Sequence, residues 1–223
     1  MSDAYVHALA LGIDRAWRRL PCEERRESLA DWQRSLRDVD GVKTFTYTMV
    51  GLHPGADLML WSLADSYEGL EERAAAVLRS ELGAWCSVTE SLVGVVRPSQ
   101  YVKRPTAQEQ SLFQGERARY LVVYPFTKSA DWYLLGRESR QGIMNEHIRV
   151  GHDFPQVRQL LANSFGIDDM DFLVAYETDD LAVFGDLVRA LRGTESRRST
   201  VRDTPILVGV HRQPSDIERL LGG

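Results

Sequence analysis

One order of elements occurs twice in this chain, and it limits the possible folds more than any other feature. Alternating and helical spacings of apolar residues predict strand, helix, strand, strand, helix and strand over residues 4–97, and again over residues 119–210. A β-α-β-β-α-β unit is the ferredoxin-like arrangement, in which an antiparallel sheet carries both helices on one face. The sequence therefore predicts an α+β fold of two ferredoxin-like halves, residues 1–105 and residues 106–223.

The centres of the two halves also match in detail. Residues 51–65 run glycine, turn, aspartate, apolar strand, aspartate and helix, and residues 166–180 repeat this order. An internal duplication is the economical explanation. The elements predicted for the second half are strand 119–126, helix 137–150, strands 156–166 and 170–178, helix 179–193 and a last strand at 204–210. Two such units can leave a ligand cavity between a sheet and its helices.

Composition and charge exclude several classes of protein. The chain is 43% hydrophobic and 26% charged with a net charge of -5, as in ordinary globular proteins, and the lack of a dense Lys/Arg block argues against nucleic acid as a partner. Cys22 and Cys86 lie far apart and outside any C-x-x-C pair, which gives no support to a zinc site or a disulfide framework. No secretory pattern opens the sequence and no apolar run reaches membrane-spanning length. We expect a cytoplasmic protein without a membrane span.

His147 is the first candidate site residue. It shares a helix face with Ile143, Met144 and Val150, which predicts that its imidazole points inward. A half-buried, hydrogen-bonded histidine is the ordinary interpretation of this pattern. The functional alternative is an axial haem ligand, which needs only one imidazole with a partner on its other ring nitrogen.

Tyr124 and Lys128 lie in a β-rich run and continue one strand face. The ordinary interpretation is a buried aromatic with a satisfied hydroxyl and a lysine at an exposed strand end. The functional interpretation of Lys128 is an ammonium group that pairs with a carboxylate-bearing ligand. Arg192 and Arg197 could serve the same purpose, or could simply complement the carboxyl end of a helix.

Several sequence runs, taken together, resemble a known family. They are YPFTKSADWYLL, MNEHIRVG and SFGIDDMDFLVAYETDDLAVFGDLVRALR in the second half, and WRRL, VGLHPGADLMLW and RPSQYV in the first. In order and spacing these runs resemble the chlorite dismutase-like haem proteins, particularly their coproheme decarboxylase branch. The resemblance implies two ferredoxin-like halves, haem b or iron coproporphyrin III (coproheme) bound in the C-terminal half, and a ring of five subunits.

The same resemblance implies roles for individual residues. His147 matches the proximal iron ligand of the family, Tyr124 its redox-active tyrosine and Lys128 the lysine of the same segment. Arg192 resembles a propionate-binding arginine, and Glu195 the acid that orients the proximal imidazole.

The distal side of the haem distinguishes the family's activities. Chlorite dismutases carry an arginine there and one group of decarboxylases a glutamine, and this chain offers Arg158 and Gln159 as neighbours. Because a strand alternates its faces, only one of them can point at the iron. Actinobacterial-type decarboxylases use a distal histidine, and residues 106–114 contain none, which leaves the catalytic base open.

Three functions follow as hypotheses. The first is peroxide-dependent oxidative decarboxylation of coproheme to haem b, with hydrogen peroxide as co-substrate. The second is conversion of chlorite to chloride and dioxygen, for which Arg158 would be the distal cation. The third is a haem-binding protein with little catalysis.

Overall fold

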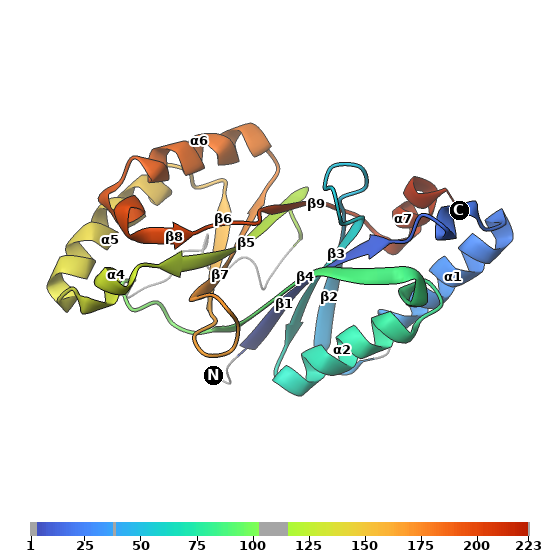
Figure 1. Ribbon diagram of the computed structural model, residues 1–223. Helices are drawn as coiled ribbons and strands as arrows, with labels where there is room; N and C mark the ends of the chain where they lie inside the picture. Colours follow the sequence, from blue (N-terminus) through green and yellow to red (C-terminus); the bar gives the residue numbers. More distant parts are fainter. Residues whose placement is uncertain (1–3, 38, 103–115, 223) are drawn as a thin grey trace. The chain divides into compact units, whose positions relative to one another are not determined.

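The computed structural model describes residues 4–37, 39–102 and 116–222, and its contacts divide the chain into two units. The first unit contains residues 1–96 and 208–223, and the second contains residues 97–207. The predicted boundary between residues 105 and 106 lies outside the described residues. Each unit contains the predicted strand and helix order (Figure 1).

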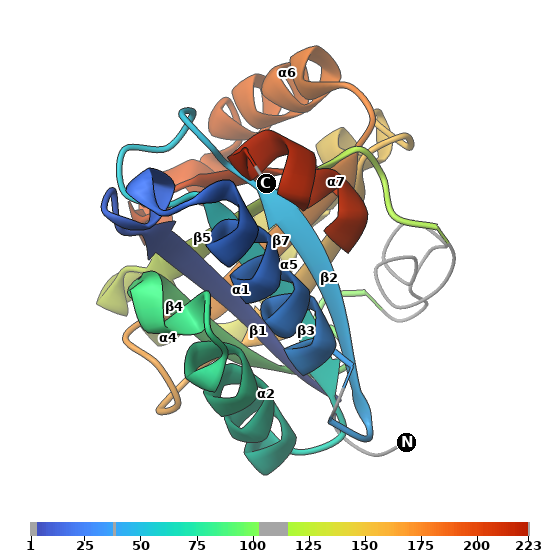
Figure 2. The same ribbon diagram turned by 90° about the vertical axis from the view of Figure 1, so that its right-hand side faces the viewer.

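The first unit is a ferredoxin-like unit. Its elements are β1 (Ala4–Ile13), α1 (Cys22–Ser35), β2 (Val42–Thr48), β3 (Leu58–Ala64), α2 (Tyr67–Arg79) and β4 (Cys86–Val96). The strands pair antiparallel in the order β4-β1-β3-β2. Figure 2 shows α1 and α2 together on one face of this sheet. This is the predicted arrangement.

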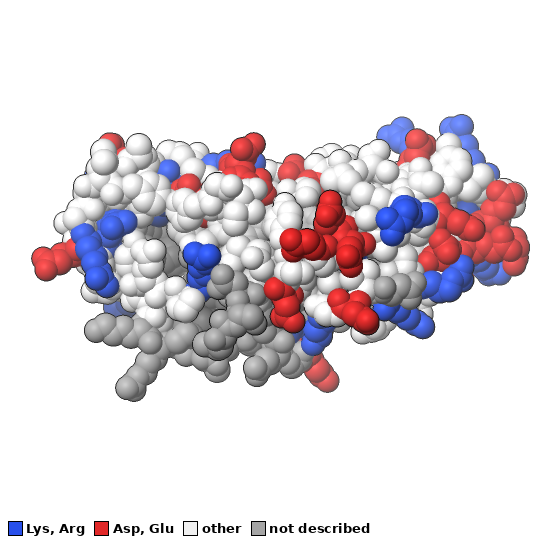
Figure 3. All heavy atoms as spheres, turned by 90° about the horizontal axis from the view of Figure 1, so that it is seen from below, with Lys and Arg blue, Asp and Glu red and all other residues white. Residues whose placement is uncertain are grey.

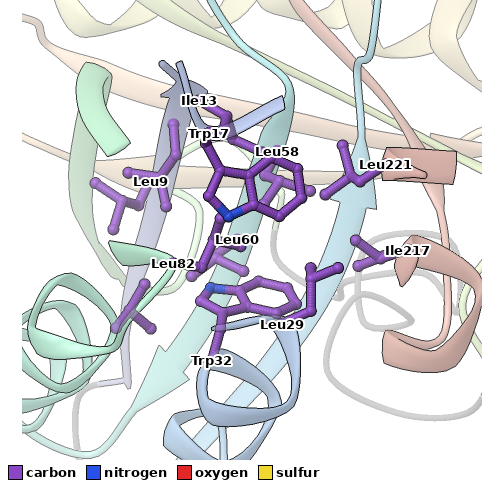
Figure 4. Packing of buried hydrophobic residues seen from close by; sticks show 12 residues of the cluster. Leu9, Ile13, Trp17, Leu29, Trp32, Leu58, Leu60, Leu82, Ile217 and Leu221 are labelled. Atoms are coloured by element: carbon purple, nitrogen blue, oxygen red, sulfur yellow. The ribbon is translucent and has the colours of Figure 1, made fainter. Parts of the chain in front are cut away.

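Two tryptophans lie at the centre of the hydrophobic core of the first unit. Trp17, on the short 3-10 helix η1 (Trp17–Arg19), and Trp32, on α1, are both fully buried. Their rings lie over the leucines of β3 (Figure 4). The indole Nε1 of Trp17 donates a hydrogen bond to Ser28 Oγ at 2.9 Å, so its polar atom is satisfied inside the core.

The second unit repeats the order. Its elements are β5 (Tyr120–Lys128), α4 (Ala130–Leu134), α5 (Arg137–His152), β6 (Arg158–Asn163), β7 (Phe172–Thr178), α6 (Leu181–Arg192), the 3-10 helix η3 (Glu195–Ser199) and β8 (Thr200–Arg202). The strands pair antiparallel in the order β6-β7-β5-β8, which is the order of the first unit. Asp180 caps α6 by accepting hydrogen bonds from the N–H groups of Ala182 and Val183.

The last strand of the second half differs from the sequence prediction. The apolar run 204–210 predicts this strand, but the structure closes the second unit with the three-residue β8. The apolar run forms β9 (Leu207–His211), which pairs with β2 of the first unit, and α7 (Pro214–Leu221) adds Ile217 and Leu221 to the first core. A strand as short and polar as β8 has no alternating pattern of apolar residues. The sequence therefore predicts the last strand at the apolar run that follows β8.

Charged side chains of both signs are spread over the face shown in Figure 3, without a continuous basic surface on its described residues. Such a mixed surface gives no single-sign field that would steer a polyanion to this face. Among the residues that the structure describes, no helix is long and apolar enough to cross a membrane.

Candidate functional site

The helix α5 carries His147 and is lightly buried along its whole length. None of its residues is fully buried, and the side chains of Ile143, Met144 and His147 are half-buried. The helix packs against α6 and η3, and α5 and α6 lie side by side in Figure 1. Apolar side chains on this face of α5 are therefore left partly available to a ligand.

The imidazole of His147 is held through one nitrogen. Its Nδ1 lies 3.0 Å from Ser196 Oγ. The pKa of His147 is lowered to about 4, chiefly by burial and also by the nearby Lys128 charge, while Glu146 opposes the shift. The imidazole is neutral at neutral pH, which is the form that ligates a metal.

Two hydrogen bonds join η3 to α5. The backbone N–H of Glu195 donates to Glu146 Oε2 at 2.9 Å, and Ser196 Oγ contacts the next residue of the helix, His147. The carboxylate of Glu195 instead pairs with Arg198, with Glu195 Oε2 3.3 Å from Arg198 Nε on the surface. Ser196 is thus the described residue that contacts the imidazole. Sequence reasoning reached its neighbour Glu195 and missed it, because serine has no signature of its own at this position.

Lys128 is buried rather than exposed at a strand end. Its side chain is 8% exposed, its Nζ donates to the carbonyl of Ser196 at 2.8 Å, and the ammonium lies 4.6 Å from the ring centroid of Trp132. The pKa of Lys128 is lowered to about 8, chiefly by burial and also by the charge of Arg197. Lys128 and His147 therefore meet at one residue, Ser196.

Tyr124 lies beside a second tyrosine. Its ring stacks on that of Tyr176 with a centroid distance of 6.1 Å and an interplanar angle of 26°, and Tyr176 in turn contacts Phe184 of α6 at 5.2 Å. Burial raises the pKa of Tyr124 well above its usual value, and the neighbouring Tyr176 hydroxyl and the Asp203 charge act in the same direction. Tyr124 is protonated at neutral pH.

Arg192 belongs to the surroundings of Tyr124. Its charge opposes the increase in the pKa of Tyr124, and its Nη2 lies 3.9 Å from Asp203 Oδ2. Asp203 also accepts a hydrogen bond from Arg197. The Arg192 side chain remains about half exposed, so its guanidinium is accessible to a ligand at the edge of this face.

The register of β6 separates Arg158 from Gln159. Gln159 is paired with Tyr176 across the β6–β7 ladder, and directly paired residues of an antiparallel sheet share a face. Since Tyr176 stacks on Tyr124, Gln159 lies on the face of Tyr124. Arg158 is paired with Glu177 on the opposite face, where its Nη2 lies 2.9 Å from Glu177 Oε2.

Apolar surface remains on the Tyr124 face. Leu161 follows Gln159 by two residues on β6 and is 48% exposed, although it is a large hydrophobic residue in the body of a strand. Its partner across the ladder is Val174. An apolar ligand that covers this face would remove such surface from water.

A hollow of about 470 Å³ lies elsewhere on α5. Its lining comes from another side of α5 and its end, and from the segment that follows β4. The lining residues are Tyr101, Val102, Asn145, Ile148, Arg149, His152 and Asp153. None of the predicted site residues lines it. Within the described ranges, no group of three His, Cys, Asp or Glu side chains is placed to hold a metal ion.

Sequence and structure comparisons relate this chain to known proteins. A family model described as chlorite dismutase matches residues 25–212. A coproheme decarboxylase of Mycolicibacterium smegmatis is 33% identical over 165 residues, which cover 73% of this chain and 70% of the relative. The structure of the chlorite dismutase from Candidatus Nitrospira defluvii in complex with imidazole superposes with a TM-score of 0.89 at 28% identity, covering 99% of this chain and 95% of that one.

Proposed function

The chain belongs to the chlorite dismutase family, and we propose that it is a haem-dependent oxidoreductase that converts coproheme to haem b by peroxide-dependent oxidative decarboxylation. Two propionates of the iron porphyrin would become vinyl groups, so the porphyrin is both substrate and cofactor. The observation that carries the proposal is the shared face of Tyr124 and Gln159, from which Arg158 is turned away by its ion pair with Glu177. The relative named coproheme decarboxylase supports the same activity.

The residues on this face fit a haem-type group. His147 is a neutral imidazole with one nitrogen held by Ser196, which leaves Nε2 to bind iron. The partly exposed apolar residues of β6 and α5 suit the flat apolar faces of a porphyrin. Arg192, exposed at the edge, and Lys128, which uses one of its three N–H donors on Ser196, suit the carboxylates.

Tyr124 supplies the hydrogen-atom chemistry. When bound, the iron porphyrin supplies oxidising equivalents derived from hydrogen peroxide. Because Tyr124 is protonated at neutral pH, removal of an electron from its ring requires that its hydroxyl proton leave as well. The charge of Asp203 acts on that hydroxyl, which makes this carboxylate the candidate proton acceptor, and the neighbouring Tyr176 hydroxyl could relay the proton by passing on its own.

Arg192 and Lys128 would fix which propionates react. Salt bridges from Arg192 and Lys128 would orient the carboxylates, so that the carbon chain of one propionate faces Tyr124. Each ionised propionate loses carbon dioxide, two electrons and one proton, while one hydrogen peroxide takes up those two electrons, that proton and one further proton from solvent to give two waters. The reaction is therefore balanced with one peroxide for each propionate.

A reconstitution experiment tests this function. The protein is loaded with coproheme, titrated with hydrogen peroxide, and the porphyrin mass is followed, with chlorite-dependent oxygen release measured on the same preparation. Loss of the two carboxyl groups without oxygen release from chlorite is the expected result. Rapid oxygen release would favour a chlorite dismutase, and tight haem b binding without turnover of either substrate would favour a haem-binding protein.

A further inference from the structure

We propose that Ser196 and Thr194 are positioning residues that set the tautomer of His147, with the proton on Nδ1 and a bare lone pair on Nε2. The proposal rests on a chain of three contacts. Thr194 Oγ1 lies 2.7 Å from the carbonyl of Leu191, Ser196 Oγ lies 3.1 Å from Thr194 Oγ1, and His147 Nδ1 lies 3.0 Å from Ser196 Oγ.

The short contact between Thr194 Oγ1 and the carbonyl of Leu191 favours one direction for every hydrogen bond in the chain. A carbonyl oxygen only accepts, so the single hydroxyl proton of Thr194 is used on Leu191. Thr194 Oγ1 can then only accept from Ser196, which uses the single proton of Ser196. Ser196 Oγ can in turn only accept from His147, which therefore carries its proton on Nδ1.

Burial enforces this direction. Thr194 is 5% exposed and Ser196 4% exposed, so water does not readily replace a missing partner. In the opposite tautomer Ser196 would donate to Nδ1 and Thr194 would donate to Ser196, so the 2.7 Å hydrogen bond from Thr194 Oγ1 to the carbonyl of Leu191 would be lost. The backbone of Ser196 is also held in place, because its carbonyl accepts from Lys128 Nζ at 2.8 Å.

The consequence for iron binding rests on the proposed function. A histidine free in water prefers its proton on Nε2, which blocks that nitrogen as a ligand. The hydroxyl chain holds the proton of His147 on Nδ1, which leaves Nε2 free to bind iron. The acceptor of the Nδ1 proton is the neutral hydroxyl of Ser196. A carboxylate in the same place would draw the Nδ1 proton more strongly and make the imidazole a stronger donor to iron.

The tautomer is testable in the protein without porphyrin. In protein labelled with ¹⁵N-histidine, long-range proton–nitrogen correlation spectra at neutral pH report which nitrogen of His147 is protonated, and a His147→Gln variant assigns the signal. We expect protonated Nδ1 in the wild type. Protonated Nε2 in the wild type would overturn the proposal.

Thr194 gives the sharpest variants, because it does not contact the histidine. In Thr194→Val, Ser196 loses its acceptor and can donate to Nδ1, so the tautomer should switch to protonated Nε2, while Thr194→Ser should keep the wild-type tautomer. Ser196→Ala should also shift toward protonated Nε2. Ser199→Ala, on the same 3-10 helix, is the matched control and should leave the spectrum unchanged. A folded Thr194→Val protein with protonated Nδ1 would contradict the proposal.

Coproheme affinity separates this inference from the proposed function. Loss of an outer-shell partner of a metal-bound histidine typically lowers affinity about 10- to 100-fold, and we expect a decrease of that order in Thr194→Val and Ser196→Ala. If the tautomer switches while coproheme affinity does not change, the tautomer assignment stands and iron ligation by His147 fails.

Discussion

Arg158 and Gln159 are neighbours in sequence and have different tasks in this structure. Arg158 neutralises Glu177, a fully buried carboxylate that also lies 3.4 Å from Arg117 Nη1, whereas Gln159 lies on the face of Tyr124. The alternation of a strand predicts that one of the two faces the site, but it does not say which one. The choice needed the register of β6 against β7, which the sequence does not contain.

This difference predicts opposite effects of two substitutions. Arg158→Ala removes one of two cationic partners of a buried carboxylate and, because Arg117 remains, should lower the free energy of unfolding by about 1–3 kcal/mol. Gln159→Ala should leave stability within about 0.5 kcal/mol and change turnover instead. Urea unfolding of the two variants checks this, with Arg198→Ala as an exposed ion-pair control that should be nearly neutral. Equal stability of the two alanine variants would contradict the assignment of faces.

Lys128 predicts a pH dependence of stability. Burial lowers its pKa to about 8, against the 10.5 of a free lysine, so between these values the unfolded chain binds more protons than the folded one. The stability of the wild type should therefore rise relative to Lys128→Met as the pH increases from about 8 to about 10.5. Chemical unfolding of both proteins across this range measures the difference. A constant difference would show that the ammonium is not destabilised by burial.

At the scale of elements, the duplicated strand and helix order made most of the fold predictable from sequence. The helices of the second unit, α5 and α6, fall where their apolar spacing predicts them. The end of the chain does not, because β8 carries no periodic signal, whereas the apolar run beyond it forms β9, which pairs in the first unit together with α7. In the candidate site, the helix face predicted only that His147 points inward, and the family resemblance made it a candidate ligand, whereas Ser196 and Tyr176 came only from tertiary contacts.

The pairing of β9 with β2 makes a prediction about Gly209. A Cβ at this position would lie 2.6 Å from Tyr47 Cβ, which is too close for any side chain without a shift of the strand. Gly209→Ala should destabilise the protein by about 1–3 kcal/mol. Gly142→Ala on the exposed side of α5, where a Cβ would meet nothing within 4 Å, should instead stabilise it by about 0.5–1 kcal/mol. Thermal unfolding of the two variants measures whether Gly209→Ala lowers stability and Gly142→Ala raises it. Unchanged stability of Gly209→Ala would contradict the close pairing of β9 with β2.

At the scale of the whole molecule, the two duplicated units differ in how deeply their first long helix is buried. The helix α1 of the first unit buries Ser28, Leu29 and Trp32, while the corresponding helix α5 of the second unit has no buried residue. This asymmetry is consistent with one unit retaining a structural role and the other leaving surface for a ligand. The resemblance to the family further leads us to expect a ring of five subunits, a state that sedimentation analysis can measure.

Porphyrin binding should therefore protect one unit more than the other. A ligand that binds only the folded state raises its stability by mass action, and the local effect should be greatest at α5, α6 and η3. Hydrogen exchange of the protein with and without coproheme measures this, with α1 and α2 as internal controls. Equal protection of both units would argue against a site in the second.

The role of Tyr124 is tested most directly by the variant Tyr124→Phe loaded with coproheme. The substitution removes the hydroxyl of Tyr124 and keeps the ring that stacks on Tyr176. The measurement is the mass of the porphyrin after titration with hydrogen peroxide, beside the wild type loaded to the same occupancy. We predict that the wild type forms haem b, and that Tyr124→Phe binds coproheme with wild-type affinity and forms none. Normal haem b formation by Tyr124→Phe would contradict the proposed mechanism.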